Sequence, residues 1–114
     1  LPLTDYLITL LKQRKANTGS IFVFEGNDPS KPINTLQKQV VKARTISGIY
    51  FSIHDLRRTF ITIAESLSIR EYTLKRLMNH KNARDVTAGY IIKEIESLRQ
   101  PMEKISDFIL EQVK

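Results

Sequence analysis

The sequence has no cysteine and no tryptophan, and its uninterrupted apolar runs are at most four residues long. Without cysteine the chain forms neither disulfides nor thiolate metal sites. A membrane helix needs about 20 apolar residues and a signal peptide about 7 to 15, so we expect a soluble, cytoplasmic protein. The sequence also begins with Leu1 rather than methionine, and we therefore expect it to be part of a longer polypeptide.

Basic residues outnumber acidic ones, with 18 Lys+Arg against 12 Asp+Glu over 114 residues and a formal net charge of +6. Residues 1–90 hold 14 of the bases and 7 of the acids, whereas residues 91–114 hold 4 bases and 5 acids. With no repeat or low-complexity tract, we expect one domain over 1–114, with a basic body over 1–90 and a helical tail over 91–114. The body's net charge of +7 favours a polyanionic partner such as nucleic acid.

Helical patterns dominate the first half of the chain. Thr4 is expected to cap a helix that ends around Ala16 to Gly19, and residues 21–24 form a short β-favouring run. A second helix is predicted from about Asn34. We expect its inward residues to be Leu36, Val40 and Val41, and its outward residues to be Lys38, Lys42 and Arg44.

The middle of the chain has clearer helix starts. Ser52 and Asp55 have the spacing of a capping box, with Phe51 and Leu56 at the hydrophobic-staple positions. Ser68 and Glu71 repeat that spacing, and Asn82 with Asp85 suggests a third start. The apolar face of the helix that Ser52 begins is predicted to be Leu56, Phe60, Ile63, Ala64 and Leu67, and that of the next helix Leu74, Leu77 and Met78. The fold class is therefore mainly α, with at most a short β element near the N-terminus.

Four residues in this helical body have the chemistry for phosphoryl transfer without a metal. The reaction needs a nucleophile, fixed positive charge on the phosphate oxygens and a proton-transfer group. Tyr90 is the candidate nucleophile, Arg57 the phosphate clamp, and His54 and His80 the hydrogen-bonding and proton-transfer groups. Each alone is more typical of a helix end, a solvated face or a core, and it is their conjunction that indicates a site. A zinc site is disfavoured, because the two histidines lie 26 positions apart with no cysteine and no HExxH motif.

Taken together, these motifs resemble the C-terminal part of the catalytic domain of tyrosine recombinases, or phage integrases. The family's H-x-x-R is matched by His54 to Arg57, its later L-x-H by residues 78–80, and its tyrosine by Tyr90, ten positions after His80. Residues 1–4 are similar to the family's "V-P-L-S" segment. The longer step to the tyrosine, followed by a helical tail, is most similar to integrases of prophages and genomic islands.

The resemblance implies a function and a role for each residue. Tyr90 would attack the scissile phosphate and form a 3′-phosphotyrosyl link, Arg57 and His54 would hold that phosphate, and His80 would bind a non-bridging oxygen. It implies site-specific integration or excision of mobile DNA at double-stranded attachment sites, by a synaptic homotetramer, with accessory DNA-bending proteins as candidate partners. No metal or nucleotide cofactor and no membrane is implied. Candidate contacts to the DNA backbone are Lys38, Lys42, Arg44 and Arg58.

One departure concerns residues outside this sequence. The family also uses an earlier arginine and a hairpin lysine, upstream of the segment where this chain begins. A tyrosine hydroxyl with a pKa near 10 is only about 0.1% ionised at neutral pH, so we expect the 114 residues alone to be almost inactive.

Three questions remain open at this level. Ala64, Ser68 and Leu74 have the spacing of a helix-turn-helix, which would make residues 56–79 part of a non-catalytic DNA-binding protein that reads DNA with Arg70, Lys75 and Arg76. Pro101 either kinks the tail helix or begins a separate final helix. The apolar tail residues pack on the chain's own core or dock on a neighbouring protomer; they are Ile95, Leu98, Met102, Ile105 and Ile109.

Overall fold

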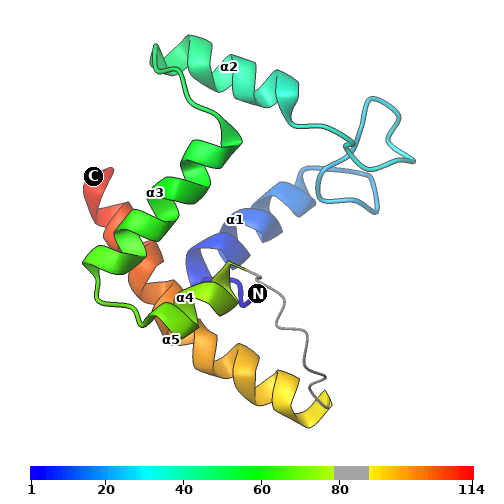
Figure 1. Cartoon of the computed structure of the whole chain (residues 1–114). Coiled ribbons are helices and arrows are strands. Elements are labelled where there is room, and N and C mark those ends of the chain that lie inside the picture. Colours follow the sequence, from blue (N-terminus) through cyan, green and yellow to red (C-terminus); the bar gives the residue numbers. More distant parts are fainter. Residues whose placement is uncertain (79–87) are drawn as a thin grey trace. The chain divides into compact units, whose positions relative to one another are not determined.

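The computed structural model describes residues 1–78 and 88–114, and it describes the side chains of 1–78 and 94–114. Five helices lie within these residues: α1 Asp5–Ala16, α2 Gln37–Ser47, α3 Ile53–Ser66, α4 Glu71–Leu77 and α5 Ala88–Gln112 (Figure 1). The described residues form no strand, although Glu25 and Pro32 make an isolated antiparallel bridge. The mainly α class is confirmed.

The chain divides into two compact units. The first unit contains residues 1–7 and 59–114, and the second unit contains residues 8–58. The boundaries fall inside α1 and α3, so each of these helices contributes to both units. The expectation of a single domain over 1–114 stays a prediction.

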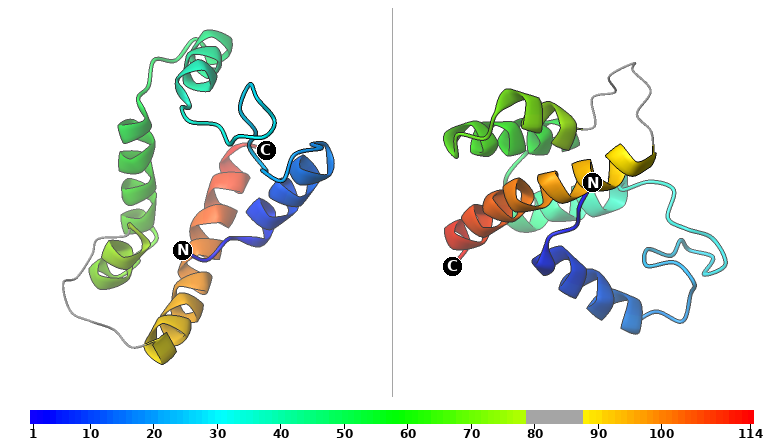
Figure 2. Two further views of the ribbon diagram at one scale, coloured as in Figure 1. Left: turned by 90° about the vertical axis from the view of Figure 1, so that its right-hand side faces the viewer. Right: turned by 90° about the horizontal axis from the view of Figure 1, so that it is seen from below.

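The hydrophobic core of the described residues lies in the first unit. It combines the second half of α3 with α4 and α5, and Figures 1 and 2 show α4 against α5. Half-buried Phe60, Ile63 and Leu67 pack against it, which confirms this part of the predicted α3 face. The buried side chains are Ala64, Leu74, Leu77, Met78, Leu98 and Ile105. Leu98 and Ile105 therefore pack on the chain's own core, as ordinary packing of the tail requires.

The first residues of the chain are held against α5. Thr4 is 2% exposed, and its hydroxyl accepts a hydrogen bond from the Leu7 amide at 3.3 Å, which confirms it as the cap of α1. The Asp5 amide donates to the Glu103 carboxylate at 2.8 Å, and Arg99 donates to the Leu3 carbonyl at 3.3 Å. These bonds join segments almost a hundred positions apart.

The turn between α3 and α4 differs from the predicted second capping box. Ser68 has a φ of 57°, in the left-handed region, and the Ile69 amide donates to the Ala64 carbonyl at 3.0 Å. The Ser68 amide donates to the Glu65 carbonyl at the same distance. This pattern is a Schellman motif that ends α3. Arg70 rather than Ser68 precedes α4, and it makes no side-chain capping bond. The prediction is wrong because Ser68 serves the helix before it.

The tail forms one helix. α5 is 25 residues long and continues through Pro101 without a break, so a separate final helix beginning at Pro101 is excluded. No helix in the described part of the chain is long and apolar enough to cross a bilayer.

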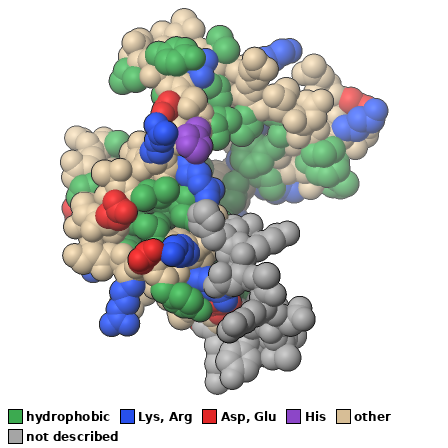
Figure 3. All heavy atoms as spheres, in the orientation of Figure 1, with side chains coloured by type: hydrophobic (Ala, Val, Ile, Leu, Met, Phe, Trp, Pro, Cys, Tyr) green, Lys and Arg blue, Asp and Glu red, His purple; other side chains and the backbone are tan. Residues whose placement is uncertain are grey.

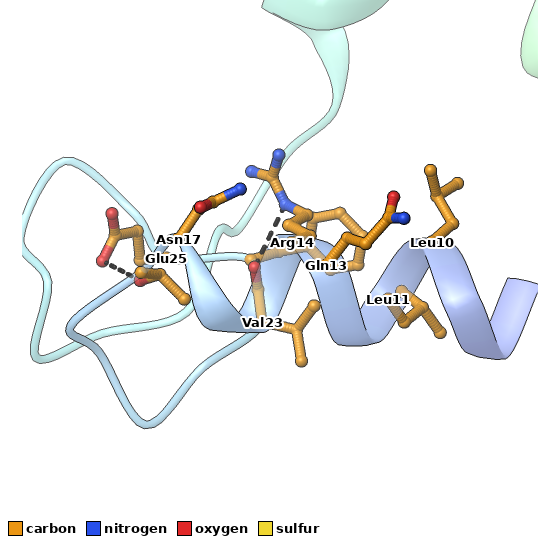
Figure 4. Close-up of a pocket in the computed structure, with 9 residues that line it drawn as sticks. Leu10, Leu11, Gln13, Arg14, Asn17, Val23 and Glu25 are labelled. Carbon is orange, nitrogen blue, oxygen red and sulfur yellow. Dashed lines mark hydrogen bonds between the residues drawn. The ribbon is translucent and has the colours of Figure 1, made fainter.

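In the second unit, the β-favouring run over residues 21–24 is bent and does not form a strand. Side chains bond two of its backbone groups: the Ser20 hydroxyl accepts from the Phe22 amide at 3.1 Å, and Arg14 Nε donates to the Val23 carbonyl at 3.1 Å. The Phe24 carbonyl accepts from the Ile33 amide at 2.9 Å, next to the isolated bridge. Figure 4 shows Arg14 reaching that carbonyl from α1, beside a groove of about 520 Å³ that Leu10 and Leu11 also line. Hydrogen bonds from side chains therefore take the place of strand pairing at Phe22 and Val23.

Helix α2 begins at Gln37, three residues later than predicted, and its predicted inward face is wrong in part. Val40 is half-buried, but Leu36 and Val41 are each 51% exposed. Leu56, predicted to lie inward on α3, is 55% exposed. Periodicity shows which residues share an apolar face, but it does not show whether another part of the chain packs against that face.

Candidate functional site

The positive charge of the chain belongs to the second unit. Residues 8–58 contain nine Lys and Arg against three Asp and Glu, which gives +6, the whole formal net charge. The first unit contains nine of each, so its net charge is zero. A polyanion is therefore attracted to the second unit, which holds Lys38, Lys42, Arg44, His54, Arg57 and Arg58.

The start of α3 is fixed by the predicted capping box. The Ser52 amide and hydroxyl donate to Asp55 Oδ2 at 2.8 and 2.7 Å, and the Asp55 amide donates back to Ser52 Oγ at 3.2 Å. These bonds from the Ser52 backbone and hydroxyl lower the pKa of Asp55, and the positive charges of Arg58 and His54 lower it further. The first turn of α3 is thus held by a charged carboxylate at neutral pH.

His54 lies on this first turn and Arg57 on the next, three positions apart, so both project from the same side of the helix. Both side chains are exposed, as is Arg58. Figure 3 shows a histidine side chain, in purple, with Lys or Arg side chains in blue and an acidic side chain in red beside it. An imidazole and a guanidinium on one exposed face can bind the oxygens of one phosphate group.

Lys38 and Lys42 lie on α2, four positions apart and both exposed, so they form one basic edge of that helix. Lysines on one edge are suited to phosphates of a nucleic-acid backbone, to which they contribute charge without reading sequence. Their role in DNA binding stays a prediction.

Arg44 has contacts that sequence reasoning did not anticipate. Its Nε donates to the Phe51 carbonyl at 2.6 Å, and its guanidinium lies 4.5 Å from the Tyr50 ring centroid and 5.8 Å from that of Phe51. The guanidinium is therefore already engaged inside the second unit. The signal in the sequence was the pair of aromatic residues just before the capping box, within reach of a basic residue near the end of α2.

The other two predicted catalytic side chains are not described. His80 lies outside the described residues, and so does the predicted helix start at Asn82 and Asp85. Tyr90 falls within α5, but its side chain is outside the described part. Their convergence with His54 and Arg57 stays a prediction.

The helix-turn-helix alternative has a matching backbone but a poor recognition surface. Ala64 and Leu74 are buried and Ser68 makes the turn, as that spacing requires. However, Arg76 pairs with Glu94 and keeps only 18% of its side chain exposed, and Lys75 pairs with Glu71 at 2.7 Å. Two of its three proposed DNA-reading cations are therefore paired with acids, in a unit of zero net charge.

Comparison with known proteins gives one significant similarity. The chain is 28% identical over 116 aligned positions to the prophage integrase IntF of Escherichia coli strain K12. The alignment covers 96% of this chain and 25% of that relative, so the chain spans about a quarter of the length of the protein it matches. No protein-family model matches the chain, and no solved structure matches it.

Proposed function

We propose that these residues form the C-terminal part of the catalytic domain of a tyrosine-type site-specific recombinase. The observation that carries the proposal is the similarity to a prophage integrase along 96% of the chain. The exposed pair of His54 and Arg57, on a capped turn in the unit that holds the net charge, supports it.

In the proposed reaction, Tyr90 Oη gives its proton to a base at the site, attacks the phosphorus of one DNA strand and becomes bonded to it. The bond to the 5′ oxygen breaks, and the 5′-hydroxyl leaves with a proton supplied by an acid at the site. The phosphoester energy is kept in the 3′-phosphotyrosyl link, so that a second strand's 5′-hydroxyl reverses the step and reseals the DNA. Arg57 neutralises the charge that grows on the non-bridging oxygens, His54 binds the same phosphate and transfers protons, and His80 binds a non-bridging oxygen.

The proposed substrate is double-stranded DNA at an attachment site. Lys38, Lys42 and Arg58 are proposed to hold its backbone, which fits their exposure and the charge of the second unit. Synapsis by a homotetramer, with DNA-bending proteins as accessories, and action in the bacterial cytoplasm belong to the same proposal. An earlier arginine and a lysine from outside this sequence would complete the site, and the 114 residues alone should then be almost inactive.

The proposal is tested in the natural polypeptide that carries these residues. A duplex nicked near the cleavage position traps the intermediate, because the short strand diffuses away and cannot reseal. We expect a covalent protein–DNA band that disappears in Tyr90→Phe, and its persistence in that variant would refute the assignment of the nucleophile. Arg57→Lys should reduce the band strongly, because a point charge does not reproduce the guanidinium fork.

A further inference from the structure

One peptide group at the start of α3 is held at both ends by charged side chains. The Phe51 carbonyl accepts from Arg44 Nε at 2.6 Å, and the amide of the same peptide bond, that of Ser52, donates to Asp55 Oδ2 at 2.8 Å. A guanidinium, a peptide dipole and a carboxylate thus lie in series. Such a chain of hydrogen bonds is polarised in one direction, and each bond strengthens the next.

Arg44 also brackets the connection that leads to this peptide. Its own carbonyl accepts from the Gly48 amide at 2.9 Å, where Gly48, with a φ of 68°, ends α2. Its guanidinium lies over Tyr50 and Phe51, at 4.5 and 5.8 Å from their ring centroids. Residues 48–52 link α2 to α3, and Gly48, Tyr50 and Phe51 among them therefore contact this one residue.

We propose that Arg44 is a positioning residue: it sets the orientation of the first turn of α3, and through it aims His54 and Arg57 at the DNA phosphate. This inference rests on the proposed recombinase function. His54 lies between Ser52 and Asp55 in the chain, and Arg57 follows on the next turn, so a rotation of the Phe51–Ser52 peptide moves both. It is an alternative to the backbone-contact role expected for Arg44 from the sequence, which stays a prediction, and it rests on the Nε donor and the ring contacts that Arg44 makes within the second unit.

The two roles predict opposite results for a conservative substitution. A phosphate contact needs a positive charge, which lysine supplies. The positioning role of Arg44 needs a planar group that donates through Nε and stacks on a ring. In the natural polypeptide, Arg44→Lys should keep its affinity for duplex DNA within about twofold while the rate of covalent trapping falls about 10- to 100-fold. Trapping at the wild-type rate in Arg44→Lys would overturn the positioning role.

Two further variants control for charge and for folding. Lys42→Ala removes one charge from the same helix, and it should weaken DNA binding and its salt dependence more than Arg44→Lys does. Tyr50→Leu removes only the stacked ring, on a side chain that is 83% exposed, and should slow trapping by about two- to fivefold without unfolding the protein. If Tyr50→Leu and Arg44→Lys both form the covalent product at the wild-type rate, the positioning role of Arg44 is excluded.

A second readout does not depend on any activity. NMR titration of Asp55 reports the Ser52 bonds, because the Ser52 amide and hydroxyl hold the pKa of that carboxyl below its ordinary value of 3.8. In Arg44→Lys this pKa should rise toward 3.8 as the peptide turns away. If the wild-type protein forms no covalent product but the Asp55 pKa rises in Arg44→Lys, the proposed recombinase function is wrong and the structural role of Arg44 is confirmed. An unchanged Asp55 pKa in Arg44→Lys would show that Arg44 does not position this turn.

Discussion

At the scale of single residues, Asp55 couples the start of α3 to pH. It accepts two hydrogen bonds from Ser52, at 2.8 and 2.7 Å, and its pKa is lowered in the folded protein. A carboxyl whose folded pKa lies below its unfolded value stabilises the fold above the unfolded pKa. That contribution is lost as pH falls through the folded pKa.

This gives a prediction for Asp55→Asn, which resembles the protonated side chain at every pH. Thermal unfolding followed by circular dichroism should show the variant melting below wild type at pH 7. The gap should close as pH falls below the ordinary value of 3.8 and the folded carboxyl takes up its proton. Asp107→Asn, an exposed aspartate of α5, controls for the loss of one charge. A gap that persists to pH 2 would contradict the link to Asp55 ionisation.

Ser68 gives a second prediction at this scale. It has a φ of 57°, where a Cβ costs about 1 to 2 kcal/mol and glycine has no such penalty. Ser68→Gly should therefore raise the free energy of unfolding by about 0.5 to 1 kcal/mol, as measured with urea. Ser66→Gly, two positions earlier within α3, should lower it by about the same amount. If both variants are destabilised, the strain at Ser68 is not relieved by glycine.

At the scale of elements, helix caps can be predicted from the sequence, whereas the surfaces against which helices pack cannot. The Ser52–Asp55 box and the Thr4 cap were predictable because their atoms lie within three positions of each other. Ser68 was misassigned because the same side chain suits a helix start and a helix end, and the Schellman bonds to Ala64 and Glu65 decided between them. Exposed Leu36 shows the other limit, since periodicity does not say what a face packs against.

The proline of α5 carries a prediction about a whole element. Pro101 lies inside the helix, where it removes a backbone donor and crowds the carbonyl four residues earlier, a loss of about 3 kcal/mol. Pro101→Ala should raise the free energy of unfolding by about 1 to 3 kcal/mol in thermal melts. Gln100→Ala, its exposed neighbour, should change it by less than about 0.5 kcal/mol. A less stable Pro101→Ala would mean that ring packing of this half-buried side chain outweighs the helix penalty.

At the scale of the whole molecule, the division of charge predicts which unit binds DNA. Each lysine that neutralises a phosphate contributes about 0.9 to the slope of log affinity against log salt. The double variant Lys38→Ala with Lys42→Ala should therefore reduce that slope on duplex DNA by about 1.8. Arg70→Ala with Lys75→Ala removes the same charge from the first unit and should change it little. The reverse outcome would favour the helix-turn-helix alternative.

The site as a whole was predictable in the same uneven way. That His54 and Arg57 share a face follows from their spacing on a helix, and the structure of α3 agrees. The hydrogen bond from Arg44 to the Phe51 carbonyl joins residues seven positions apart across the end of α2, and helical periodicity does not predict it. Convergence with His80 and Tyr90 depends on contacts between segments far apart in the chain, which local patterns do not encode. It stays a prediction.

The nucleophile is the most direct point at which to test the account. Covalent product is formed in the natural polypeptide on a nicked attachment-site duplex, digested with protease and nuclease, and analysed by mass spectrometry. We predict that the peptide carrying Tyr90 retains a nucleotide linked through its 3′-phosphate. A nucleotide found on any other residue, or a covalent product in which the Tyr90 peptide is unmodified, would contradict the proposed function.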